Sequence, residues 1–192
     1  MPGAINRFIV RCSESWWKIV LIFIGQSATF QVLNRITGNF PALTAGDIPF
    51  DMQNSLTTAQ IFSQLSGYSD EAFRQYWIFQ AVDYLFPLFA GLLLAVICAA
   101  ALRTASPRLY QIACERHLFL LLLIPTVFDW SENLGLLWTV AAWPEQADFA
   151  ASLAVAAKMG KLTTMLISFA ATAILLLWGA GVYAHKFFRP GD

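Results

Sequence analysis

Three side chains that can bind a ligand or transfer a proton occur within one short segment, at Asp129, Glu132 and Asn133. Positions i, i+3 and i+4 share one face of an α-helix, so the two carboxyls and the amide are expected to lie together. Two carboxyls this close repel each other when both are ionised, so one should keep its proton or meet a cation. Such a pair can anchor a ligand, or act as general acid and base.

Polar side chains on two other segments are expected to complete this site. Gln80 and Asp83 lie three positions apart, with Tyr84 beside them, and Gln31 and Asn34 repeat the same spacing. Residues three apart are neighbours on a helix surface. The predicted ligand-binding residues are therefore Gln31, Asn34, Gln80, Asp83, Tyr84, Asp129, Glu132 and Asn133. We also predict that Lys158 or Lys161 reaches the acids, because the loop that carries them should lie over the mouth of the cleft.

The composition indicates that these groups lie in a membrane. Of the 192 residues, 58% are hydrophobic and only 12% are charged, whereas soluble domains are about 25% charged. The formal net charge of +0 excludes the basic surface of a nucleic-acid-binding protein. A helix needs about 20 mostly apolar residues to cross the hydrocarbon core. Four stretches are predicted to do so, at about 17–33, 78–102, 118–138 and 162–184.

The chain is therefore predicted to be a single all-α domain, a polytopic membrane protein built as an antiparallel four-helix transmembrane bundle. An interfacial helix is expected at about 4–15, and the outer loop 34–72 should contain a short helix. A helical stretch at 148–158 would complete a small extracytoplasmic cap. The second helix is expected to run unbroken from Ser69 into the membrane. Kinks are expected at Pro87 in this span and at Pro125 in the third span. Those kinks would leave space beside the acids, which lie in the outer halves of their spans.

Basic residues and cysteines predict the orientation. Eight of the 12 Lys and Arg residues fall on the side of the N-terminus, the second loop and the C-terminus: Arg7, Arg11, Lys18, Arg103, Arg108, Arg116, Lys186 and Arg189. Basic loops stay cytoplasmic, so both termini should be cytoplasmic in a bacterial inner (plasma) membrane. The three cysteines fall on or near that side, where thiols stay reduced. We expect no disulfide.

Motifs for other chemistry are absent from the sequence. It contains no Walker A, G-x-G-x-x-G, H-E-x-x-H, C-x-x-C or G-x-S-x-G pattern, so nucleotide, metalloprotease, redox and serine-hydrolase chemistry lack support. His117 and His185 would lie at the same membrane surface, but interfacial histidines are ordinary. We predict no cofactor and no metal.

Three short segments carry a resemblance. Gly67 to Glu71 (GYSDE), Asp83 to Pro87 (DYLFP) and Phe128 to Asn133 (FDWSEN) together resemble a group of small bacterial four-span membrane proteins without an assigned activity. This resemblance implies the topology and no chemistry. A weaker similarity is to the emopamil-binding, sterol-isomerase-like membrane fold, whose acids protonate an alkene. A matching catalytic histidine is absent, so no residue is transferred from that fold.

Three functions fit these patterns. The first is a binding or transport-related protein whose outward-facing polar cleft holds a small amphiphile, a lipid or a cation. The second is an accessory subunit of a larger membrane complex, or a homo-oligomer, that packs through small-residue faces. The third is a lipid- or isoprenoid-modifying enzyme that uses Asp129 and Glu132 as acid and base. Membrane lipids are expected partners in each case.

Overall fold

The computed structural model describes residues 2–188, and within them it is helical without a β-strand. The helices are α1 (Pro2–Ser13), α2 (Trp16–Asn39), η1 (Phe40–Ala42), η2 (Phe50–Met52), α3 (Thr58–Leu65), α4 (Asp70–Asp83), α5 (Phe86–Ala105), α6 (Pro107–Glu115), η3 (Leu118–Leu123), α7 (Ile124–Ala142) and α8 (Asp148–Phe188). Four stretches are long and apolar enough to span a membrane: Trp16–Ala42, Asp70–Ala105, Leu118–Ala142 and Asp148–His185. The all-helical class and the four candidate spans are therefore confirmed. Arg189 lies outside the described residues.

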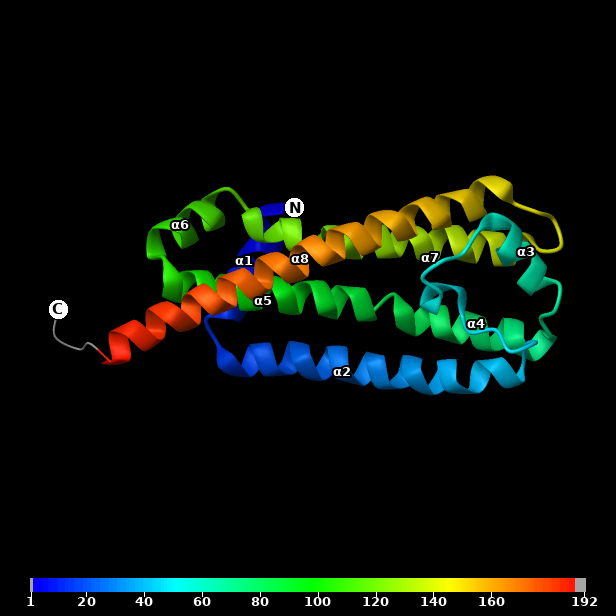
Figure 1. The fold of residues 1–192 in the computed structure, drawn as a ribbon, viewed down its shortest axis with the longest axis horizontal. Helices are drawn as coiled ribbons and strands as arrows, with labels where there is room; N and C mark the ends of the chain where they lie inside the picture. Colours follow the sequence, from blue (N-terminus) through cyan, green and yellow to red (C-terminus); the bar gives the residue numbers. More distant parts are fainter. Residues whose placement is uncertain (1, 189–192) are drawn as a thin grey trace.

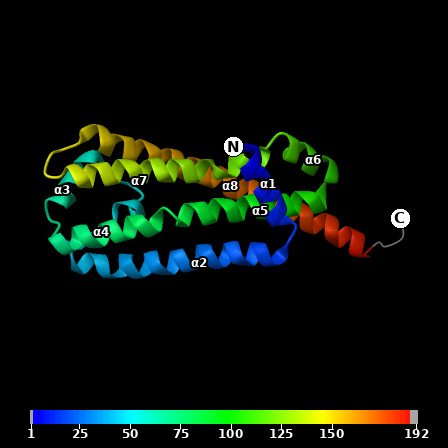
Figure 2. The ribbon, with the colours of Figure 1, turned by 180° about the vertical axis from the view of Figure 1, so that it is seen from behind.

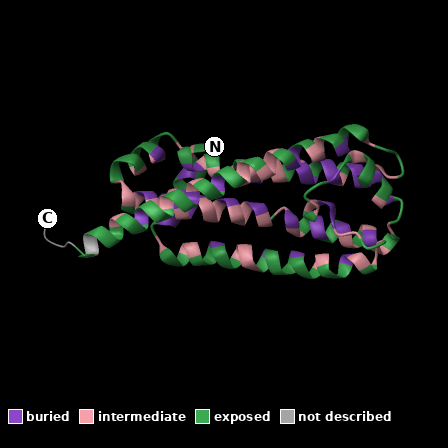
Figure 3. Cartoon of the chain, viewed as in Figure 1, coloured by how far each residue is buried: buried purple, intermediate pink, exposed green. Residues whose placement is uncertain are grey.

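Helix α5 occupies the middle of the molecule. It packs against α2 on one side and against α7 and α8 on the other (Figure 1). Helices α1 and α6 lie at one end, and α3 with the long loop lies at the other end (Figure 2). Much of α2 and of the second half of α8 is exposed (Figure 3). Many of the exposed side chains there are large and apolar. Six buried polar side chains lie toward the end that carries α3: Gln80, Asp83, Glu132, Asn133, Thr139 and Lys158.

The second span is interrupted, which corrects the prediction of one unbroken helix. Helix α4 ends at Asp83, and α5 begins at Phe86 with Pro87 in its first turn. Proline lacks an N–H and cannot continue the hydrogen-bond ladder from the preceding turn. Helix α7 supplies two side-chain donors at this break: the Trp130 indole donates to the carbonyl of Tyr84 at 2.9 Å, and the Thr126 hydroxyl donates to that of Pro87 at 2.7 Å. These two hydrogen bonds tie α7 to the backbone on both sides of the break, and the one from Trp130 satisfies the Tyr84 carbonyl.

The third and fourth spans also differ from the sequence prediction. Residues 118–123 form a 3-10 helix, and α7 begins only at Ile124, with Pro125 in its first turn. The stretch predicted as a separate cap helix at 148–158 is continuous with the fourth span, because no proline separates them and Gly160 between them stays helical, with the Phe128 ring packed where a Cβ would lie. The result is one 41-residue helix that runs beside α7. This continuity gives the lysines near its start a fixed position relative to α7.

The loop between α2 and α4 folds onto the end of the helices. Its Phe40 and Phe50 are fully buried against Tyr76 of α4, and Tyr68 stacks on Phe50 with ring centroids 5.6 Å apart. The short helix α3 begins with a capping box between Thr57 and Gln60, which fixes its first turn. This loop is therefore an ordered part of the core.

Candidate functional site

The centre of the site is an ion-pair cluster between α7 and α8. Glu132 is fully buried, and its two carboxylate oxygens lie 2.8 Å from the ammonium of Lys158 and 2.5 Å from that of Lys161. The Lys161 ammonium also lies 3.2 Å from Asp129. The prediction that one of these lysines reaches the acids is confirmed, and both of them do. Their spacing of three places them on the face of α8 that packs on α7.

Asn133 joins this cluster to the second span. Its side-chain amide donates to Asp83 at 2.8 Å and to Asp129 at 3.4 Å. Asn133 is fully buried and Asp83 nearly so. Three of the four spans therefore meet at one buried polar cluster, as the spacing within α4 and α7 predicts.

The long loop supplies a fourth carboxyl, Asp51, which the sequence analysis does not identify. Its Oδ2 accepts hydrogen bonds from the Gln80 amide at 2.5 Å and from the Tyr76 hydroxyl at 3.4 Å. The Lys158 ammonium donates to the backbone carbonyls of Phe50 and Gln53, both at 2.8 Å. Lys158 thus fastens the loop to α8 as well as pairing with Glu132.

The cluster contains more carboxyls than ammonium groups. Asp51, Asp83, Asp129 and Glu132 face only the two lysines, which gives a formal charge of −2 when all six groups are ionised. Burial, and after it the charges of Asp83 and Glu132, raises the pKa of Asp51 well above its usual range. Three buried oxygens, Asp51 Oδ1, Gln80 Oε1 and Asn133 Oδ1, accept no hydrogen bond within the described residues. The cluster therefore has spare capacity for a proton or another cationic donor.

The raised pKa of Asp51 predicts a pH-dependent stability. A carboxyl whose pKa is higher in the folded than in the unfolded state makes folding take up a proton, so stability falls as pH rises from about 4 toward the folded-state pKa. Asp51→Asn cannot ionise, so its stability should fall less steeply with pH than that of wild type, by up to about 1.4 kcal/mol per pH unit. The new amide can donate to Gln80 Oε1. Thermal unfolding in detergent between pH 5 and 8, followed by tryptophan fluorescence, measures it. Asp70→Asn, at the exposed start of α4, is the control, and an Asp51→Asn slope equal to the wild-type slope contradicts the prediction.

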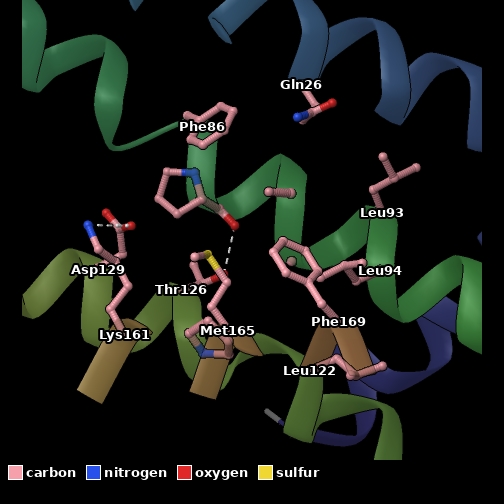
Figure 4. A pocket seen from close by; sticks show the side chains of 14 residues that line it. Gln26, Phe86, Leu93, Leu94, Leu122, Thr126, Asp129, Lys161, Met165 and Phe169 are labelled. Atoms are coloured by element: carbon pink, nitrogen blue, oxygen red, sulfur yellow. Dashed lines mark hydrogen bonds and ion pairs between the residues drawn. The ribbon is translucent and has the colours of Figure 1, made fainter. Parts of the chain in front are cut away.

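An apolar cavity of about 210 Å³ adjoins the cluster where α2, α5, α7 and α8 surround it. Asp129 and Lys161 lie at one end of it, whereas Leu93 and Leu94 lie toward the other (Figure 4). Gln26 of α2 faces the cavity across from α7 and α8. The cavity thus combines one charged end with a largely apolar wall.

Two predicted site residues do not belong to this arrangement. Gln31 and Asn34 are exposed, because the side of α2 that packs on the rest of the molecule carries Thr29 and Leu33 instead. Their predicted contact with the cluster is wrong. Gln26, one turn earlier, is the α2 side chain that lines the cavity.

Tyr84 lies at the break between α4 and α5, where its backbone carbonyl, and not its hydroxyl, makes the contact with α7. The other predicted residues, Gln80, Asp83, Asp129, Glu132 and Asn133, meet in the cluster. Asp51 joins the cluster and Gln26 lines the adjoining cavity, and neither follows from the sequence pattern.

Searches against protein-family models, curated proteins and solved structures find no match to this chain. No group of three or more His, Cys, Asp or Glu side chains within the described residues is arranged to hold a metal ion. All three cysteines, Cys12, Cys98 and Cys114, are free thiols.

Proposed function

We propose that this chain is a multi-pass protein of the bacterial inner (plasma) membrane that binds a small amphiphile in the cavity between α2, α5, α7 and α8. The observation that carries the proposal is the cavity itself, with the Asp129–Lys161 pair at one end and leucine and phenylalanine side chains along the rest (Figure 4). An amphiphile has the same division between a polar head group and an apolar tail. Ligand sites in general combine apolar walls with a few well-placed polar groups.

The membrane setting is supported by exposed apolar side chains on the candidate spans. Leu166 and Leu177 of α8 are 71% and 75% exposed, and Ile174 is 65% exposed. Such surfaces are stable against lipid and aggregate in water. In the proposed arrangement the four spans alternate in direction, and the end with α1 and α6, which carries Arg7, Arg11 and Arg108, faces the cytoplasm. The polar cluster then lies toward the outer surface.

The size of the cavity and its surroundings fit a ligand that enters from the bilayer. Its volume exceeds the roughly 150 Å³ of an apolar protein cavity that holds benzene. Helix α2 packs on α4 and α5, and α8 packs on α5 and α7. Helices α2 and α8 therefore lie on different sides of α5 (Figure 1). Residues of both α2 and α8 line the cavity. Phe169 of α8, which lines it, is 50% exposed. A single acyl or isoprenoid chain can therefore extend from the cavity into lipid.

Filling the cavity tests this function. Ala90 of α5 lines the cavity, and Ala90→Trp should weaken binding of a decyl amphiphile at least tenfold, because the indole occupies the space of the ligand. The probes are decylamine, decanol and decyl phosphate, titrated calorimetrically into protein in phosphatidylcholine nanodiscs, with empty nanodiscs subtracted. Ala180→Trp makes the same change on an exposed position of α8, about 16 Å along the helix from Phe169, and should leave binding unchanged.

This titration and two further observations separate the three candidate functions. Absence of saturable binding by all three probes, or equal binding by the Ala90→Trp variant, contradicts the proposal. Co-purification with a larger membrane protein at fixed stoichiometry would favour an accessory subunit instead. Chemical conversion of a bound isoprenoid or fatty-acyl lipid, lost in Asp129→Asn, would favour an enzyme.

A further inference from the structure

Resting on the proposed function, we infer that the amphiphile bound in this cavity carries a cationic head group, an amine or a quaternary ammonium, which pairs with Asp129. The inference concerns the charge of the ligand and not only its shape. Two observations support it: the Asp129 carboxylate has weak contacts, and the carboxyls of the cluster outnumber its lysines.

Lys161 is held more closely by Glu132 than by Asp129. Its ammonium lies 2.5 Å from the Glu132 carboxylate and 3.2 Å from that of Asp129. The second oxygen of Asp129 has only the long 3.4 Å hydrogen bond from Asn133. Of the carboxyls in the cluster, Asp129 is the one that lines the cavity. A ligand in the cavity therefore meets the Asp129 carboxylate, whose contacts are weak. The neighbouring Lys161 ammonium is already paired with Glu132.

The total charge of the cluster favours a cation in the same way. Even when Asp51 is counted as protonated, the carboxyls of Asp83, Asp129 and Glu132 outnumber the two lysines. An uncompensated charge in an apolar environment is costly. The fully buried Asn133 Oδ1 also lacks a donor within the described residues. One ligand ammonium near Asp129 would bring the formal charge to zero.

An anionic head group fits this site poorly. It could pair with Lys161 only beside the Asp129 carboxylate, and drawing Lys161 toward the ligand would weaken its contact with the buried Glu132. The ends of α4 and α5 that meet at the helix break add little net charge, because the negative end of one dipole lies beside the positive end of the other. The cavity therefore selects against phosphate and carboxylate head groups.

The three decyl probes test the inference at a single tail length. At pH 7 in phosphatidylcholine nanodiscs, wild-type protein should bind decylamine, which is cationic there, about tenfold more tightly than decanol, and decyl phosphate most weakly. Asp129→Asn keeps the shape of the side chain and removes its charge, so decylamine should then bind no better than decanol. Asp70→Asn removes one exposed carboxyl from α4 and should leave the wild-type order intact.

Failure of this inference differs from failure of the proposed function. If decanol or decyl phosphate binds wild type as tightly as decylamine, and Ala90→Trp still abolishes binding, the cavity binds amphiphiles and the cationic preference is wrong. If no probe binds, both proposals are wrong. An unchanged decylamine preference in Asp129→Asn excludes Asp129 as the partner. The order in wild-type protein decides the inference even if Asp129→Asn fails to fold.

Discussion

Glu132→Gln is expected to lower the free energy of unfolding by about 3–5 kcal/mol, the range observed when one partner of a buried ion pair is removed. Glu132 is fully buried and contacts two ammonium groups. Without its charge, Lys158 keeps its backbone carbonyl partners and Lys161 keeps only Asp129. Lys158 would then have lost its direct carboxylate contact, and Lys161 would retain one of its two. Equilibrium unfolding in mixed detergent micelles, followed by tryptophan fluorescence, measures the change.

The chain contains a matched control for this substitution. Glu71 and Arg74 form an ion pair at 2.7 Å, close to the 2.8 Å between Lys158 and Glu132, but their side chains are 41% and 69% exposed. Exposed pairs contribute about 0–1 kcal/mol. Glu71→Gln should therefore change stability by no more than that. Similar effects at the two positions would show that burial does not set the strength of the Glu132 contacts, and the charged cluster would lose its structural importance.

The part of the site that could be predicted from sequence is the part that lies within single helices. Asp129, Glu132 and Asn133 share a face because helical geometry dictates it, and Gln80 and Asp83 follow the same rule. Asp83, Asp129, Glu132 and Asn133 meet as predicted, and Gln80 adjoins them through its hydrogen bond to Asp51. Local periodicity is sufficient here because each contact partner lies on a neighbouring helix at similar depth.

The remaining members depend on tertiary packing that local spacing does not encode. Asp51 lies in η2, a single 3-10 turn within the long loop, which reaches the cluster because Phe50 packs into the core and Lys158 binds the carbonyls of this turn. Gln31 and Asn34 have helical spacing but lie on an exposed side of α2. In a membrane helix, exposed and packed faces are both largely apolar, so the hydrophobic pattern does not reveal which face packs. Pro87 predicted a kink, whereas the complete break also depends on donors from α7.

Gly135→Ala is the second substitution for which a large effect is expected, because this glycine permits the close approach of α7 and α8. A Cβ at position 135 would lie 2.8 Å from the carbonyl oxygen of Ala150 and 2.9 Å from the backbone nitrogen of Ala154. Both atoms belong to the backbone of α8, which cannot yield by a side-chain rotation. The helices must separate instead, at a cost of about 1–3 kcal/mol or more.

Separation at Gly135 should also disturb the site, since Glu132 lies one turn away on the same helix and both of its lysines are on α8. We therefore expect Gly135→Ala to lower the melting temperature and to weaken decylamine binding together. Gly181→Ala is the control, because a Cβ there has no neighbour within 4 Å and alanine favours the helix by up to about 1 kcal/mol. Its stability should be equal to or above that of wild type. A Gly135→Ala protein as stable as the Gly181→Ala protein would mean that α7 and α8 are not in backbone contact here, and the short distances from Glu132 to Lys158 and Lys161 could not hold.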